Sequence, residues 1–258
     1  MTIPNITPEQ IELFLLIFLR VSAIVVTLPI LGNRTVPVRV KAGLSFLIAF
    51  LIFPFVHFEV PKGDIAVFPL MFRMAGEVLV GVIIGFTARL IFAGIQMAGQ
   101  LVGFQMGFGI VNVVDPVTSA QISIIAQFKY LIAMLIFLAI NGHHVFLYAI
   151  SESYRILPPL GFHFSGELME AIFLFSRNMF IVAVKVGAPI MAVLLFTSVA
   201  LGLIVRTVPQ VNVFIVGFPL KIGVGMIGIG LAMPILLRVV EKIFSNLEGE
   251  VNLLLQLM

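Results

Sequence analysis

Long apolar runs, interrupted by short groups of glycine, proline and polar residues, dominate the chain of 258 residues. About 20 consecutive apolar residues are enough for an α-helix to cross a bilayer, and clusters of glycine and proline commonly mark the ends of helices. On this basis the pattern predicts six helical segments, near residues 13–31, 43–57, 66–98, 122–149, 170–206 and 211–240.

Local signals add detail to three of these segments. Thr7, Pro8 and Gln10 match a capping box with proline at the first helical position, which predicts the start of the first helix. The third and fifth segments are longer than a bilayer requires, so we expect them to tilt strongly or to extend out of the lipid. Pro189, inside the fifth segment, predicts a kink.

The composition places the chain in a membrane. Hydrophobic residues make up 61% of the sequence and charged residues 10%, against about half and about a quarter in soluble domains. The absence of cysteine excludes disulfides and thiolate metal sites. The net charge of +3 comes from Lys and Arg spread along the chain, without the basic stripe of a nucleic-acid-binding protein. We therefore predict an all-α membrane protein that does not bind nucleic acid.

Four cations lie deep inside the predicted segments. They are Arg20, Arg89, Lys185 and Lys221. Each costs about 2.5 to 3.5 kcal/mol at the centre of a bilayer, so we expect them to face protein or water, although snorkelling is an alternative that suits Arg73 and Arg206 near segment ends. The segments offer only two carboxylates, Glu77, four residues after Arg73 on the same helix face, and Glu170. We therefore expect other subunits to supply the missing acceptors.

Glycines recur at helical spacing in the middle of the chain. Gly81 and Gly85 form a pair that indicates the close approach of another helix. Gly99, Gly103 and Gly107 repeat at every fourth residue, and one interpretation is a flat helical ridge for the same purpose.

The other interpretation of residues 99–121 is a re-entrant or pore-lining loop. Gly109, Asn112, Asp115 and Pro116 all oppose a helix. Irregular backbone at membrane depth is tolerated only where protein buries it or where it lines a wet cavity. The bulky apolar residues between the glycines, which would seal such a conduit, are Met106, Phe108 and Ile110.

The sequence contains no recognisable catalytic or metal motif. Asp115 is a candidate proton carrier, but beside a proline it more commonly caps a turn. His143 and His144 are adjacent and have no third ligand at a matching spacing. Nucleophile elbows, phosphate loops and nucleotide fingerprints are also missing. We therefore predict no enzymatic activity, no cofactor and no metal site.

Three stretches resemble the FliR family of flagellar biosynthetic proteins. QMGFGIVNVVDP at residues 105–116 is similar to the central signature of that family, and RTVPQVNVFIVGFPLKI at 206–222 is similar to the tight turn of its C-terminal helical hairpin. NGHH at 141–144 also fits. The positions that carry the loop and turn resemblance are Gln105, Asn112, Asp115, Pro116, Arg206, Pro209, Gln210 and Asn212.

The resemblance implies a subunit of a protein export gate. In this family residues 1–165 would form a FliP-like part that contains the glycine-rich loop, and 166–258 a FliQ-like hairpin. One such subunit would complete a helical ring with several FliP and FliQ subunits, next to FlhB and FlhA, in the bacterial inner membrane within the flagellar basal body. Unfolded flagellar proteins would cross the pore. The family's pore plug maps onto Met106, Gly107, Phe108, Gly109 and Ile110.

Two alternatives to the flagellar export gate remain open. The same type of subunit serves virulence injectisomes, and the motif at 112–116 favours the flagellar system. A secondary transporter would have interrupted helices at matching places in two repeated halves, and the break at 103–116 has no clear counterpart.

Overall fold

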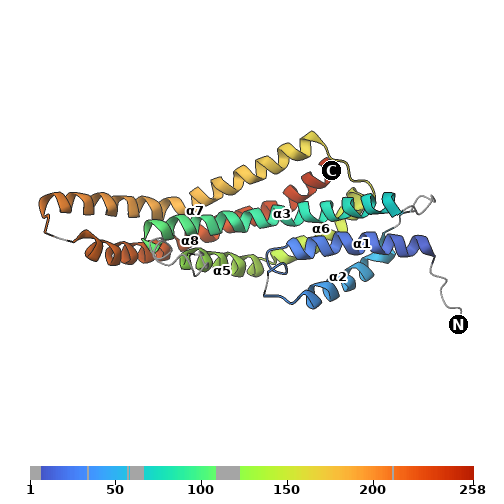
Figure 1. Ribbon diagram of the computed structural model, residues 1–258, viewed down its shortest axis with the longest axis horizontal. Helices are drawn as coiled ribbons and strands as arrows, with labels where there is room; N and C mark the ends of the chain where they lie inside the picture. The colour runs from blue at the N-terminus through green and yellow to red at the C-terminus, as the bar shows by residue number, and fades with distance from the viewer. Residues whose placement is uncertain (1–6, 34, 57, 59–66, 109–122, 211) are drawn as a thin grey trace. The chain divides into compact units, whose positions relative to one another are not determined.

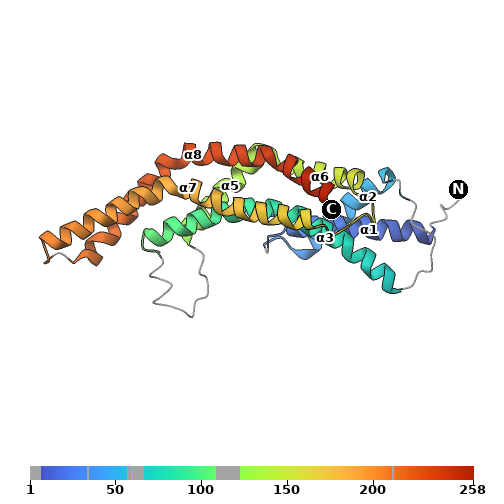
Figure 2. The same ribbon diagram turned by 90° about the horizontal axis from the view of Figure 1, so that it is seen from above.

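The computed structural model describes residues 7–33, 35–56, 58, 67–108, 123–210 and 212–258 of the chain. Within these ranges all elements of regular structure are helices, labelled as in Figure 1 and seen from above in Figure 2. They are α1 (Pro8–Thr27), α2 (Val38–Ile52), the short 3₁₀ helix η1 (Phe53–Phe55), α3 (Val67–Gln105), α5 (Ile124–Ala139), α6 (Gly142–Ile156), α7 (Gly166–Thr207) and α8 (Val213–Leu257). The predicted all-α fold class is confirmed.

Five of these helices are long and apolar enough to cross a membrane, and α5 with α6 is a bent pair that raises the number to six if it counts as one span. The longest are α7 with 42 residues and α8 with 45. At 1.5 Å per residue α7 is about 63 Å long, about twice the hydrocarbon thickness of a bilayer. The prediction that the third and fifth segments exceed one bilayer crossing is therefore confirmed.

The start of α1 follows from its sequence. The Thr7 hydroxyl accepts a hydrogen bond from the Gln10 backbone N–H, and the Gln10 side chain accepts one from the Thr7 N–H. Pro8 occupies the first turn, where its missing N–H removes no helical bond. The predicted capping box is confirmed.

The fourth predicted segment, 122–149, is wrong as a single helix. It divides into α5 and α6, which are bent by 68° relative to each other. Asn141 adopts a left-handed conformation, with φ of 56° and ψ of 29°, and Gly142 follows it as the first residue of α6. Asn tolerates this conformation better than most residues, because its short polar side chain finds local hydrogen bonds. The Asn141–Gly142 pair therefore lies at the break between the end of α5 and the start of α6.

The last helix continues beyond its predicted end at residue 240. Buried apolar side chains follow one another at spacings of four and three residues as far as the end of α8, at Val240, Phe244, Leu247, Val251 and Leu254. This spacing is that of one helix face. The intervening charged and polar residues had concealed it, because they lower the average hydropathy without interrupting the helical period.

Prolines lie inside the two longest helices. α7 contains Pro189, and α8 contains Pro219 and Pro234. Both helices continue through these positions. Each proline lacks the N–H that would bond to the carbonyl four residues earlier.

The chain divides into two compact units. The first unit comprises residues 1–90, 141–175 and 246–258, and the second comprises 91–140 and 176–245. The predicted division at residue 165 concerns similarity to other subunits, and it stays a prediction.

In the first unit α1 lies against the N-terminal part of α3. A side chain at Gly81 would place its Cβ 2.6 Å from the Ala23 Cβ and 2.6 Å from the Arg20 carbonyl oxygen, and one at Gly85 would overlap Thr27. The predicted close approach of another helix to Gly81 and Gly85 is confirmed, and that helix is α1.

In the second unit the core is apolar and aromatic. The rings of Phe92, Phe137 and Phe244 form one cluster, with centroids 4.8 to 5.7 Å apart. A second cluster joins α3, α5, α7 and α8, and its buried members are Val102, Met106, Ile125, Ile190, Leu194, Ile229 and Ala232. We call this second set the α3-end cluster.

Candidate functional site: a buried ion pair and the root of the glycine-rich loop

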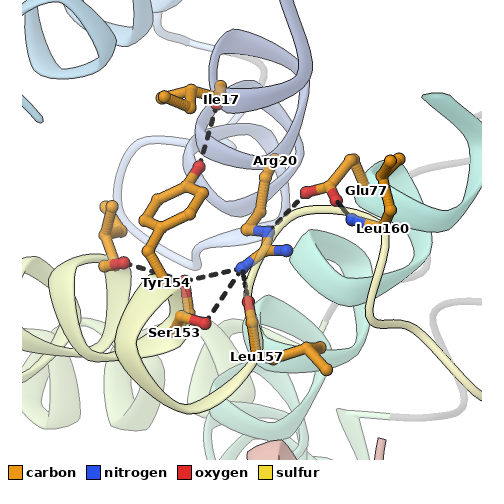
Figure 3. Close-up of polar contacts among 8 residues, drawn as sticks. Ile17, Arg20, Glu77, Ser153, Tyr154, Leu157 and Leu160 are labelled. Carbon is orange, nitrogen blue, oxygen red and sulfur yellow. Dashed lines mark hydrogen bonds and ion pairs between the residues drawn. The ribbon is translucent and has the colours of Figure 1, made fainter. Parts of the chain in front are cut away.

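A fully buried arginine forms the centre of a polar network in the first unit (Figure 3). Arg20, on α1, donates from Nε to Oε2 of Glu77 at 2.6 Å. Its Nη1 donates to the carbonyl oxygens of Ser153 at 3.0 Å and Leu157 at 2.8 Å. Because Glu77 is only 1% exposed, both charges are removed from solvent, and each stabilises the other.

The partners of Arg20 are themselves held by further bonds. The second carboxylate oxygen of Glu77 accepts a hydrogen bond from the Leu160 backbone N–H at 3.0 Å. The guanidinium carbon of Arg20 lies 4.4 Å from the centroid of the Tyr154 ring, whose hydroxyl donates to the carbonyl of Ile17 at 3.1 Å. The network therefore ties together α1, α3, the end of α6 and the connection between α6 and α7.

This geometry corrects two expectations. We expected another subunit to supply the acceptors for Arg20, but they come from this chain. We also placed Glu77 beside Arg73, which instead donates to Glu12 at 3.1 Å. Arg73 lies four residues from Glu77 along α3 but does not pair with it. A buried carboxylate is strongly destabilising unless a cation pairs with it, and the cation beside the buried Glu77 is Arg20.

The other three internal cations have no ion pair within the described ranges. Arg89 and Lys185 are exposed on this chain and Lys221 is half-buried. Their pairing with other subunits stays a prediction.

The glycine-rich region begins as a helix. α3 continues to Gln105, and its small residues face α5. A Cβ at Gly99 would lie 2.5 Å from the Cα of Ala126, and one at Gly103 would overlap Ser123. For residues 99–105 the helical-ridge interpretation is therefore the correct one.

Gly107 lies two residues after the end of α3. Its φ of +98° lies in the region that favours glycine, and its N–H donates to the carbonyl of Phe104 at 3.1 Å. A Cβ at this position would also lie 2.5 Å from the ring of Phe218 on α8. Glycine is thus required here for both backbone and packing reasons.

Met106 is a core residue. Its side chain is fully buried in the α3-end cluster, and a Cβ at Gly225 of α8 would lie 2.7 Å from it. Phe108 packs against the same cluster and is half-buried. Within this chain these two predicted plug residues therefore belong to the packed region at the end of α3.

The remaining plug and loop residues lie outside the described residues. They are Gly109, Ile110, Asn112, Asp115 and Pro116. Gln105, the last residue of α3, is described, and its Oε1 is buried without a hydrogen-bond partner in that part of the chain.

The hairpin turn lies at an exposed position between α7 and α8. Arg206, Pro209, Gln210 and Asn212 are all exposed. Asn212 precedes α8 and caps its first turn, because both its carbonyl and its side-chain oxygen accept from the N–H of Ile215, at 3.1 and 3.4 Å. The turn motif therefore presents its polar groups outward.

Lys129 is a further buried cation that the sequence analysis did not identify. Lys129, on α5, is 2% exposed, and its Nζ has no hydrogen-bond partner among the described residues. Its position well inside the predicted segment 122–149 was the signal that should have identified it. The rings of His143 and His144 lie edge to face with centroids 4.4 Å apart, and the described ranges contain no group of three potential metal-binding side chains.

Together these features define a class. The chain is an all-helical membrane protein. Its candidate functional features are packing surfaces, the buried end of α3 and buried charges.

Comparison with known sequences identifies the family. The sequence model of the family described as bacterial export proteins, family 1, matches residues 11–247. The chain is similar to the flagellar biosynthetic protein FliR of Bacillus subtilis, with 39% identity over 93% of this chain and 94% of that one. It is also similar to FliR of Escherichia coli, with 32% identity over 94% of both chains. The chain belongs to the bacterial export proteins, family 1.

The Arg20–Glu77 pair makes a testable contribution to stability. We expect Arg20→Met to lower the free energy of unfolding by about 3–5 kcal/mol, because it leaves a buried carboxylate without its cation. The double variant Arg20→Met/Glu77→Met should lose less than the sum of the two single variants. Thermal unfolding of the purified chain in detergent measures these differences.

The control for this pair is Arg73→Met. Arg73 is 32% exposed, so its pairing with Glu12 should contribute less than about 1 kcal/mol. Additive losses in the double variant would contradict the coupling of Arg20 to Glu77.

Gly107 offers a second test of the structure. Gly107→Ala should destabilise the chain by about 1–3 kcal/mol because of the positive φ, and contact with Phe218 should add to the loss. Gly223→Ala is the matched control, since a Cβ there meets nothing within 4 Å and alanine favours the helix by up to about 1 kcal/mol. Equal melting temperatures for Gly107→Ala and the unchanged chain would rule out the assigned role.

Proposed function

We propose that this chain is a structural and gating subunit of the flagellar protein export gate. The observation that carries the proposal is the family match over residues 11–247. The names of the relatives from Bacillus subtilis and Escherichia coli, flagellar biosynthetic protein FliR, favour a flagellar system over an injectisome.

The subunit would assemble with FliP and FliQ, next to FlhB and FlhA, in the bacterial inner membrane within the flagellar basal body. The apolar helices support a membrane location. Arg89, Lys185 and Lys221, which lack ion pairs in the described part of the chain, would bind carboxylates or helix C-terminal carbonyls of these neighbours. Unfolded flagellar proteins would pass through the pore of the assembly.

Gating would be steric. A narrow apolar constriction excludes water and ions until something displaces it, and the loop after Phe108 would form that constriction. The burial of Met106 and the packing of Phe108 support this assignment, because they provide the loop with a fixed attachment. The subunit would need no catalytic chemistry of its own, and energy would come from partner ATPase and proton-motive components.

Co-expression tests the assembly. We expect the full chain to co-purify with FliP and FliQ from the same organism, and Lys185→Met and Lys221→Met to reduce the yield of the complex because each leaves a partner group unpaired. Size-exclusion chromatography with quantitative mass spectrometry measures the yield. A chain that stays monomeric when all three proteins are expressed would contradict the proposed function.

Ion leak tests the plug. Phe108→Ala should raise the ion conductance of the assembled gate in planar bilayers, because it removes an aromatic ring at the attachment of the loop. Phe104→Ala removes the same kind of ring four residues, or about one helical turn, earlier, where the side chain is 75% exposed, and should leave the conductance unchanged. Equal conductance of the two variants would remove the plug assignment.

A further inference from the structure

Lys129 is a buried cation in an apolar part of the second unit. The side chain lines a small, partly open cavity between α5, α7 and α8, with Ile132, Val186, Ile190 and Ile229 among its neighbours. None of the hydrogen-bonding side chains or carbonyls in the described residues lies within bonding distance of its Nζ. An isolated ammonium in such surroundings is costly to the folded chain.

The cavity does not provide the missing partner. Its volume is about 10 Å³, the space for one water molecule at most, and a buried water needs two to four polar partners of its own. The named lining residues apart from Lys129 are all apolar. A water molecule alone would therefore leave both itself and the ammonium poorly bonded.

The second unit has few acidic groups. Its residues, 91–140 and 176–245, contain seven Lys or Arg and two Asp or Glu, a net charge of +5. The three salt bridges found among the described residues all lie in the first unit. The acidic residues of the second unit are thus too few to neutralise its positive charge.

We propose that Lys129 is a docking point for a carboxylate side chain of a neighbouring subunit. The inference rests on the proposed function, since it requires an assembly. A carboxylate offers two oxygens to the three donors of the ammonium, and the flexible four-carbon stem of lysine lets the ammonium move within the cavity toward a group that enters from the open side. A carboxylate is smaller and flatter than a lipid phosphate, so the small size of the cavity favours the carboxylate.

The variant Lys129→Met distinguishes a lysine that binds a neighbouring subunit from a lysine whose buried charge the chain only tolerates. In the isolated full chain this variant should raise the melting temperature by about 2–4 °C, because it replaces a buried ammonium with an apolar side chain. In the complex with FliP and FliQ the same substitution should reduce the yield roughly tenfold or more, because it leaves the partner's carboxylate unpaired. The two effects have opposite signs, which a merely structural lysine would not produce.

Lys242→Met is the matched control. Lys242 belongs to the same unit and is exposed on α8, so its removal changes the net charge equally without touching the cavity. We expect neither the melting temperature nor the yield to change. Lys129→Glu should abolish assembly, and exchanging one membrane-embedded Asp or Glu of FliP or FliQ for Lys should restore it.

Each other outcome excludes the docking role. A yield of the Lys129→Met complex equal to that of the unchanged complex would mean that the ammonium is only tolerated. A lower melting temperature of isolated Lys129→Met would mean that its partner lies within this chain, and equal destabilisation by Asp115→Asn would identify that partner. If the unchanged chain does not assemble at all, the proposed function itself is wrong.

Discussion

The first unit depends on one buried interaction, the ion pair between Arg20 and Glu77. Neither charge is accessible to solvent, so each would be strongly destabilising without the other. Most of the other bonds of both side chains go to backbone groups near the end of α6, including the carbonyl of Leu157 and the N–H of Leu160. An irregular connection between two apolar helices is in this way given hydrogen-bond partners that a lipid environment would not supply.

The second unit is held together by a different principle. Its described contacts are apolar and aromatic, and small residues bring its helices close, as at Gly99 and Gly225. Charges there are numerous and unpaired in the described part of the chain. The first unit thus pairs its buried Arg20 with Glu77, while the charged side chains of the second unit have no ion pair among the described residues. Such a division suits a polypeptide that functions beside other polypeptides, as we propose for the export gate.

The sequence predicted those features that depend on neighbouring residues. The capping box at Thr7 and the close approach at Gly81 are encoded within four residues, and the apolar runs located most helices. The sequence did not predict that Glu77 pairs with Arg20, because Arg20 lies 57 residues away and only the fold brings the two together. The resemblance to a known family predicts a pore plug that includes Met106, and this stays a prediction. The sequence did not predict the burial of Met106, because its neighbours come from α5, α7 and α8.

The prolines of the hairpin affect how its two long helices respond to force. Pro189, Pro219 and Pro234 each leave one carbonyl without its usual donor, so the adjacent turns already lack a bond that bending would otherwise have to break. In helices of 42 and 45 residues, we expect bending to need the least energy at these turns. Curvature can therefore concentrate at these three positions while the rest of each helix stays regular.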